Sequence, residues 1–256
     1  MSSFFLFDVR IDGDSRSHVL RIVRGAFDGT SLGGGIFCHI VTLNPEILLL
    51  ARHNESYRHV LNNAVVRTVD GVGISFVGRL FFNVRIERLT GVELFEDLLF
   101  FCCQKQKRIA IFLRFGGLSS VADVEHAFLE RFPHISLLCV EVDPCCESSC
   151  VEAVSRCESF GAEAIFVSFG APEQEFFLSK YFCDKKTSVR VGVGIGGAVD
   201  YLTKRVRRAP LWMQSVGLEW FWRLFCQPKR IARIFHAVVV FPFFVCVERF
   251  KSFFVR

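Results

Sequence analysis

The stretch VTLNPEILLLARHNESYRHVLNNAVVRTVDGVGISF, residues 41–76, alternates apolar runs with short polar clusters. Residues 36–43 predict a buried strand. Asn44 and Pro45 predict the start of a helix, because Asn caps free backbone amides and proline fits the first helical turn. Apolar residues at helical spacing follow, and residues 65–69 predict a second strand that ends at Asp70. The stretch therefore predicts a strand, helix, strand unit.

Polar side chains stand at the same ends of both predicted strands. Because the carboxyl ends of neighbouring parallel strands face one crevice, we expect Thr42, Asn44 and Asp70 to share it. Taken singly, Asn44 is explained by a helix cap and Asp70-Gly71 by a turn. The repetition of polar residues at equivalent strand ends favours a chemical role.

The same alternation of short apolar runs and amphipathic segments continues through the chain. Strands are predicted at residues 108–113, 134–142, 162–169 and 189–193, and helices at 93–105, 121–132 and 146–160. This order predicts an α/β fold with a Rossmann-like, mostly parallel sheet flanked by helices. We expect a catalytic α/β domain over residues 1–208 and a helical, membrane-associating appendage over 209–256.

The charge distribution supports this division. Residues 204–256 contain eleven Lys or Arg and two acidic residues, whereas residues 1–203 contain twenty and twenty-four. The C-terminal part is therefore near +9 and the remainder near −4. Such a segregated basic tail indicates binding to phosphates, whether of nucleic acid, lipid headgroups or a nucleotide-linked substrate.

Aromatic and basic residues are interleaved in the C-terminal part, where a helix is predicted over residues 211–227 and another from Pro228. Residues 237–247 are apolar and are bracketed by basic residues, which fits a segment in the membrane interface and equally a segment that closes the core. No run of about 20 apolar residues exists, so we do not expect a spanning helix. The apolar segment also makes nucleic acid the less favoured partner.

The cysteines and glycines offer two further hypotheses. The N-terminal residues lack the apolar run of a signal peptide, so the thiols are expected to be reduced and cytosolic. The nearest approach to a metal pattern lacks paired short spacing and a nearby His, and we expect no metal; it comprises Cys145, Cys146, Cys150 and Cys157. Gly192, Gly194 and Gly197 satisfy GxGxxG, but late in the chain, which makes a nicotinamide oxidoreductase a distant alternative.

Several motifs taken in order carry a resemblance to a known family. They are Thr42-Leu-Asn44, Asp70-Gly71-Val72-Gly73, Arg88 with Thr90-Gly91, Gly170-Ala-Pro-Glu-Gln-Glu175, Gly192 to Gly197 with Asp200, Arg208-Ala-Pro210, and Gly217-Leu-Glu-Trp220 with Arg223, Pro228, Arg230 and Arg233. Together they resemble the WecG/TagA/CpsF glycosyltransferases, glycosyltransferase family 26. The resemblance covers about residues 36–236.

This resemblance implies a metal-independent, inverting transferase that needs no cofactor. The enzyme would move N-acetylmannosamine or a related sugar from a UDP-sugar donor to a polyprenyl-diphosphate-linked acceptor. It would act in cell-envelope polysaccharide synthesis, including that of teichoic acid, from the cytoplasm as a peripheral protein at the inner face of the cytoplasmic membrane. A homo-oligomer is left open as a further partner.

The chemistry assigns roles to the matching residues. An acceptor hydroxyl needs a base, and Asp70 is the candidate. Thr42 would orient the acceptor or the base. The departing UDP needs cations and amides where charge develops. The expected substrate-binding residues are Asn44, Arg88, Gln174, Gly194, Gly196, Gly197, Asp200, Arg223, Arg230 and Arg233.

The sequence also departs from the family pattern. The family usually has Lys at Glu173, an aromatic residue at Val199, a small pair at Thr203-Lys204 and Asp at Glu93, and the loop over residues 115–119 is altered. These departures leave the candidate base intact but bear on the donor sugar. The alternative function is a membrane-peripheral protein that binds a nucleotide sugar without turnover.

Overall fold

The centre of the computed structural model, which describes residues 3–30, 37–183, 185–215, 217–226 and 231–254, is a six-stranded parallel sheet. Its strand order is β4-β3-β8-β7-β5-β6. The strands are β3 (Cys38–Leu43), β4 (Val66–Val69), β5 (Ile109–Arg114), β6 (Leu137–Val142), β7 (Ala164–Ser168) and β8 (Val191–Gly194). The predicted α/β, Rossmann-like fold is confirmed.

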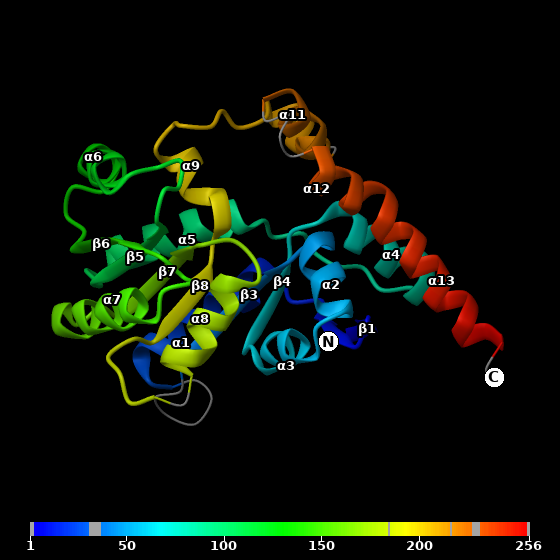
Figure 1. The fold of residues 1–256 in the computed structure, drawn as a ribbon, viewed down its shortest axis with the longest axis horizontal. Helices are drawn as coiled ribbons and strands as arrows, with labels where there is room; N and C mark the ends of the chain where they lie inside the picture. Colours follow the sequence, from blue (N-terminus) through cyan, green and yellow to red (C-terminus); the bar gives the residue numbers. More distant parts are fainter. Residues whose placement is uncertain (1–2, 31–36, 184, 216, 227–230, 255–256) are drawn as a thin grey trace.

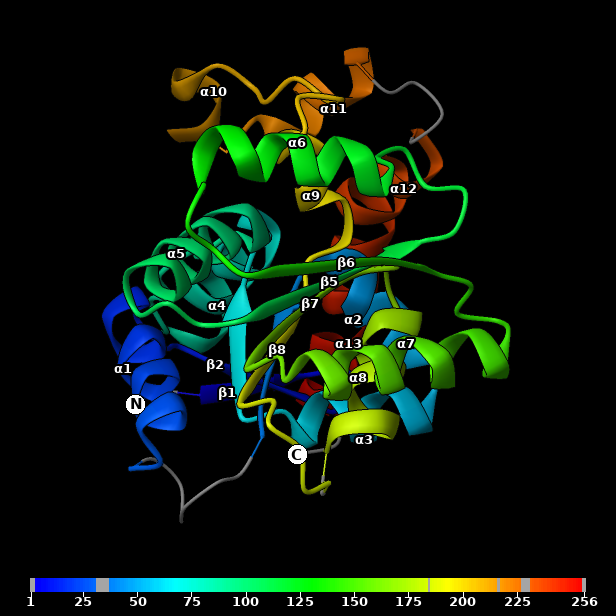
Figure 2. The ribbon, with the colours of Figure 1, turned by 90° about the vertical axis from the view of Figure 1, so that its left-hand side faces the viewer.

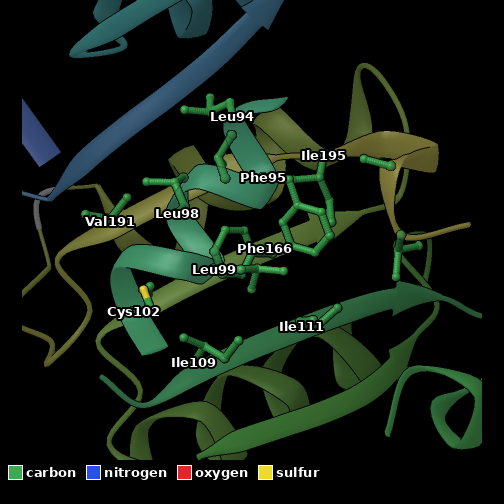
Figure 3. Packing of buried hydrophobic residues seen from close by; sticks show 14 of the residues in the cluster. Leu94, Phe95, Leu98, Leu99, Cys102, Ile109, Ile111, Phe166, Val191 and Ile195 are labelled. Atoms are coloured by element: carbon green, nitrogen blue, oxygen red, sulfur yellow. The ribbon is translucent and has the colours of Figure 1, made fainter. Parts of the chain in front are cut away.

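Side chains that alternate along the strands build a core on each face of the sheet. Ile109 and Ile111 of β5 face one core, and Ala110 and Phe112 face the other. Figure 3 shows residues of α5 packed over β5 and over Phe166 of β7. Figure 2 shows α1 and α5 on one side of the sheet and α7 and α8 on the other. Helix α6 (Val121–Arg131) packs in the same core as α5. The other helices are α1 (Arg16–Asp28), α5 (Gly91–Gln104), α7 (Glu147–Phe160) and α8 (Glu173–Phe182).

The first strand, helix, strand unit contains two helices where the sequence predicts one. The helix that begins at Pro45 ends at Arg52, and a second begins at Glu55; they are α2 (Pro45–Arg52) and α3 (Glu55–Asn63). Asn54 causes the break, because its Oδ1 accepts a hydrogen bond from the amide of Tyr57 at 2.9 Å and caps a new helix. The prediction of a single helix here was wrong, but both helices still connect β3 to β4.

A third core lies at the β3 and β4 end of the sheet and joins the two ends of the chain. The antiparallel hairpin of β1 (Ser3–Leu6) and β2 (Val9–Asp12) packs there with α4 (Val72–Phe82). Phe241 and Val245, near the C-terminus, are fully buried in the same core. The N-terminal hairpin and the C-terminal helix therefore stabilise each other.

After β8 the chain forms short helices that lead away from the sheet. They are η1 (Gly196–Ala198), α9 (Val199–Leu202), α10 (Leu211–Ser215) and α11 (Glu219–Cys226). The single helix predicted over residues 211–227 was wrong, because Gly217 adopts a left-handed φ of 78° and divides it. A Cβ atom at Gly217 would lie 2.5 Å from Val72 Cγ2, so the glycine also allows this segment to approach α4 closely.

A long apolar helix closes the chain and runs along α2 and α4 in Figure 1. It consists of α12 (Ile231–Phe235), a wider π turn η3 (His236–Val240) and α13 (Phe241–Phe254). Its part Ile231–Phe250 is long and apolar enough to cross a membrane by length and composition. An 18-residue window of this part has a mean hydropathy of 1.9, and 11% of the window is buried. The helix reaches this length although charged residues interrupt its apolar run in the sequence. The π turn precedes Pro242, whose missing N–H and bulky ring an ordinary turn does not accommodate.

Candidate active site

A cleft of about 670 Å³ lies between the carboxyl edge of the sheet and the C-terminal helices. Residues that follow β3, β4, β5, β7 and β8 form its floor. Residues 217–219 and the side of the long helix that carries Arg233 and Pro242 form the opposite wall. Ligands of open α/β sheets bind at this edge, so the cleft is the candidate active site.

Asp70 and Thr42 face this cleft from neighbouring strands. Thr42 pairs in register with Thr68, and Asp70, two residues further on, donates its backbone amide to Leu43 O at 2.8 Å. A Cβ atom on Gly91 would lie 3.5 Å from Thr42 Oγ1 and 3.9 Å from Asp70 Oδ2. The glycine thus leaves open the space that the hydroxyl and the carboxylate share. Asp70 is half-buried and lines the cleft, as a base that meets a substrate must.

Asn44 lines the cleft and also caps a helix. Its Oδ1 accepts a hydrogen bond from the amide of Ile47 at 3.0 Å, which begins α2. Nearby, α4 begins at Gly71 without a side-chain cap, and Gly71, Val72 and Gly73 line the cleft. Uncapped amides at a helix start attract negative charge, so this corner suits an anionic group.

Gln174 is a buried cross-link below the cleft. Its Oε1 accepts hydrogen bonds from the amides of Gly170 at 3.1 Å and Gly196 at 3.0 Å, so it joins the turns that follow β7 and β8. It is 3% exposed and lines the cleft together with Gly196 and Gly197. Gly194 lies behind this wall, against the Gln174 side chain. Gln174 therefore shapes the floor instead of extending freely into the cleft.

We expect Gly194→Ala to destabilise the protein by about 1–3 kcal/mol, the usual cost of overpacking a core. The new Cβ atom would lie 2.6 Å from Gln174 Cδ and 2.8 Å from Cγ, and closer still to Nε2. Urea unfolding measures the loss. Gly73→Ala is the control, because its Cβ atom would meet its nearest neighbours at 3.7 Å and should leave stability nearly unchanged. Equal stability of the two variants would contradict this account of Gly194.

Glu175 extends this buried network. Its carboxylate accepts hydrogen bonds from Tyr57 Oη at 2.9 Å and from Gln174 Nε2 at 2.6 Å. Glu175 is fully buried, and this burial raises its pKa to about 7 although the two hydrogen bonds act in the opposite direction. Burial of the Tyr57 side chain and the neighbouring Glu175 carboxylate raise the pKa of Tyr57 above its usual range.

The raised pKa of Glu175 predicts a loss of stability with rising pH. The folded state holds this proton more tightly than the unfolded chain, so the stabilisation is complete below about pH 4.5 and is lost as the pH rises towards about 7. The difference corresponds to roughly 3 kcal/mol for a shift of this size. Urea unfolding between pH 5 and 8 should show a flatter dependence in Glu175→Gln than in the wild type, and parallel curves would contradict the assignment.

Asp200 holds a second loop against the cleft. Its Oδ1 accepts a hydrogen bond from Ser119 Oγ at 2.7 Å, and Ser119 Oγ lies 2.8 Å from Thr203 Oγ1. Ser119 is 3% exposed, so these contacts fix the loop after β5 to α9. Sequence analysis identified Asp200 but missed Ser119, because an isolated serine in an altered loop carries no signal of its own.

Arg88 reaches the cleft from a short extended segment that bridges to Val69. Its Nη2 donates to Gln214 O at 3.2 Å and lies 3.8 Å from Glu219 Oε2. Glu219 Oε1 lies 3.8 Å from Nε of Arg208, so one carboxylate of the C-terminal part holds two arginines near the cleft wall. In the sequence, Glu219 stands out only as part of the motif Gly217-Leu-Glu-Trp220. Its contacts with the two arginines become visible only when the two parts of the chain meet.

Arg233 lines the cleft from the long C-terminal helix. Its Nε and Nη2 donate to Glu46 Oε1 and Oε2 at 2.8 and 2.7 Å, a bidentate pair with the first turn of α2. Nothing in the sequence singles out Glu46, because acidic residues are common in the first turn of a helix. Of the other predicted arginines, Arg230 lies outside the described residues, and Arg223 lies in α11 with a side chain outside them.

The chain matches the family model described as "Glycosyl transferase WecG/TagA/CpsF family" over residues 4–253. It belongs to this family. Three similar proteins are each an "N-acetylglucosaminyldiphosphoundecaprenol N-acetyl-beta-D-mannosaminyltransferase". The relative from Bacillus subtilis (strain 168) is 31% identical, that from Bacillus spizizenii (strain ATCC 23059 / NRRL B-14472 / W23) 32% and that from Staphylococcus aureus (strain MRSA252) 27%, each over 76% of this chain and 74% of the relative. The protein is a glycosyltransferase, and the resemblance found in its motifs is confirmed.

Two departures from the WecG/TagA/CpsF pattern have structural explanations. Glu93 forms a capping box with Thr90, since its Oε2 accepts the Thr90 amide at 2.9 Å and its own amide donates to Thr90 Oγ1 at 3.2 Å. Thr203 bonds Ser119, as described above. Glu173 is half-buried and lies 4.0 Å from Arg114, a weak pair whose arginine lines the cleft.

No group of three or more His, Cys, Asp or Glu residues in the described part of this glycosyltransferase is placed to hold a metal ion. Among the cysteines considered as ligands, Cys150 and Cys157 are buried in the core beneath α7, whereas Cys145 is exposed.

Proposed function

We propose that this glycosyltransferase moves N-acetylmannosamine or a related sugar from a UDP-sugar to a polyprenyl-diphosphate-linked acceptor, with inversion at the anomeric carbon. The observation that carries the proposal is that Asp70, at the end of β4, and Arg233, from the far end of the chain, line one cleft. The relatives' names support a sugar on a lipid diphosphate as the acceptor.

Asp70 would act as the general base. Its carboxylate would accept the proton of the acceptor hydroxyl, whose oxygen attacks the anomeric carbon from the face opposite the diphosphate. The bond from this carbon to the diphosphate breaks, and UDP leaves with the electron pair. Thr42 Oγ1, across the space left by Gly91, is placed to orient the hydroxyl or the carboxylate.

Cationic and amide groups of the cleft would stabilise the departing UDP. Arg88 and Arg233 both line the cleft, and the uncapped start of α4 adds backbone amides. Such donors, fixed before the reaction, typically lower a barrier by a few kcal/mol each. Nε and Nη2 of Arg233 donate to Glu46, and the third nitrogen, Nη1, is not part of this pair.

We further propose that residues 1–208 form the catalytic domain and that residues 209–256 complete it at the membrane. The long apolar helix supports association with the inner face of the cytoplasmic membrane. Peripheral attachment is favoured over spanning, because Phe241 and Val245 are buried against the body and Arg233 pairs with Glu46. A helix held in this way cannot present its whole circumference to lipid.

A donor screen with the purified full chain tests the function. The acceptor would be N-acetylglucosamine on a short polyprenyl diphosphate, offered with UDP-N-acetylmannosamine, UDP-glucose, a UDP-uronic acid and other UDP-N-acetyl sugars. We expect one donor to give a disaccharide product with inverted configuration by mass spectrometry and NMR. Binding of UDP without product from any donor would favour the alternative of a binding protein without turnover.

A further inference from the structure

Helix α4 carries an apolar stripe on its outer side. Val72, Phe76 and Leu80 follow one another at four-residue spacing and are 43%, 64% and 59% exposed. The opposite side of α4 is buried through Ile74 and Val77 in the core shared with the N-terminal hairpin. A surface helix of a water-soluble domain usually turns polar residues outwards, so this helix is apolar on both sides.

The stripe lies next to the long C-terminal helix. Arg249 Nη2 donates to Phe81 O at 3.1 Å, and its guanidinium lies 4.6 Å from the Phe82 ring, so the end of α4 contacts α13. At the other end, a Cβ atom on Gly73 would lie 3.7 Å from the Phe241 ring. Figure 1 shows the two helices at the same end of the molecule.

The C-terminal helix has its own exposed apolar side. Its exposed large apolar residues are Ile231, Phe235, Val238, Val239, Phe243 and Phe250. Neighbouring helices that both expose apolar side chains form a larger patch than either alone, and such patches mark interaction sites. Exposed Arg79 and Arg85 lie at and just beyond the end of α4.

We propose that α4 is a second lipid-contacting element, and that Phe76 and Leu80 enter the bilayer interface beside the C-terminal helix. This inference rests on the proposed function, since it gives the membrane-bound enzyme a two-helix contact surface. The partner that contacts the stripe is the bilayer surface, for two reasons. The stripe extends the apolar surface of the C-terminal helix, which is long enough to cross a membrane, and the flanking arginines match anionic headgroups.

The position of the stripe also connects the membrane to the chemistry. Val72 begins the stripe and lines the cleft, two residues after Asp70. Eight residues of helix place Leu80 about 12 Å further along, away from the cleft. A bilayer in contact with Phe76 and Leu80 would therefore lie beside the cleft entrance, where a lipid-linked acceptor must arrive.

The test compares the full chain with the double variant Phe76→Ser, Leu80→Ser. Co-sedimentation with vesicles of phosphatidylethanolamine and phosphatidylglycerol, free of acceptor, should show at least about tenfold weaker binding, since two large apolar side chains no longer enter the interface. Leu129→Ser on α6 is the matched control, because Leu129 is 71% exposed but distant from this surface, and it should bind as the wild type does. Thermal unfolding should be unchanged in both variants, because the replaced side chains are exposed.

Each outcome decides between the bilayer and other occupants. Unchanged vesicle binding by the double variant would overturn the proposal. Unchanged binding together with a raised KM for a long-chain acceptor alone would instead assign the stripe to the polyprenyl chain. Vesicle binding requires no donor or acceptor, so the result stands even if the donor screen finds no transfer. With a short-chain, water-soluble acceptor, the double variant should keep wild-type kcat.

Discussion

Asp70→Ala is expected to lower kcat by about 10²–10⁴-fold, the usual contribution of a general base, while the Kd for UDP stays within a few-fold of the wild type. Asp70 lines the cleft beside Thr42, whereas Arg88 lies near Glu219 and Arg233 pairs with Glu46. Transfer to a short polyprenyl-diphosphate acceptor gives kcat, and calorimetric titration with UDP gives Kd.

The isosteric variant Asp70→Asn separates charge from shape. It keeps the volume of the side chain but cannot accept the proton, so its kcat should fall as far as that of Asp70→Ala. Wild-type turnover in either variant would contradict the mechanism. If UDP binding and turnover were both lost, Asp70 would be assigned to donor binding and not to the role of general base.

Deletion of residues 209–256 is expected to abolish transfer and to weaken vesicle binding. The deletion removes the cleft wall that carries Arg233, the contacts of Glu219 with Arg88, and the apolar helix. Radiolabelled sugar transfer and vesicle co-sedimentation measure the two losses. Full transfer by the shortened chain would show that the appendage plays no part in catalysis.

Because the deletion also uncovers the core that Phe241 and Val245 fill, a single substitution must accompany it. Arg233→Ala leaves that core intact and should raise the KM for the UDP-sugar about tenfold or more, in keeping with the loss of a charged hydrogen bond to phosphate. Arg207→Ala is the matched control, since Arg207 is exposed and does not line the cleft. Equal kinetics of the two variants would contradict the role given to Arg233.

The sequence predicted the sheet well because its strands are short, apolar and separated by amphipathic helices. The register that places Thr42 near Asp70 follows directly from two adjacent parallel strands. The features that the sequence did not reveal depend on contacts between residues far apart in the chain. Gln174 matched a polar turn, but its burial and its bonds to Gly170 and Gly196 appear only after β7 and β8 pair.

The C-terminal helix shows the limit of counting apolar runs. Arg233, His236 and Pro242 interrupt the run in the sequence, so residues 237–247 counted as a short segment. In the structure, Arg233 pairs with Glu46 and a π turn precedes Pro242, so the helix continues past both. Charges that find partners on the body, and prolines that follow a widened turn, do not end a helix.

Phe241 packs against Phe7, with ring centroids 6.1 Å apart, and this contact limits the movement of the C-terminal helix. Because the C-terminal helix packs against the N-terminal hairpin in this way, it cannot move away from the body of the protein without opening their shared core. In the proposed membrane-bound state, this packing would hold the cleft at a constant height above the lipid headgroups. The proposed arrangement would then favour an acceptor hydroxyl at one distance from its lipid, and a hydroxyl one sugar further away would lie out of reach.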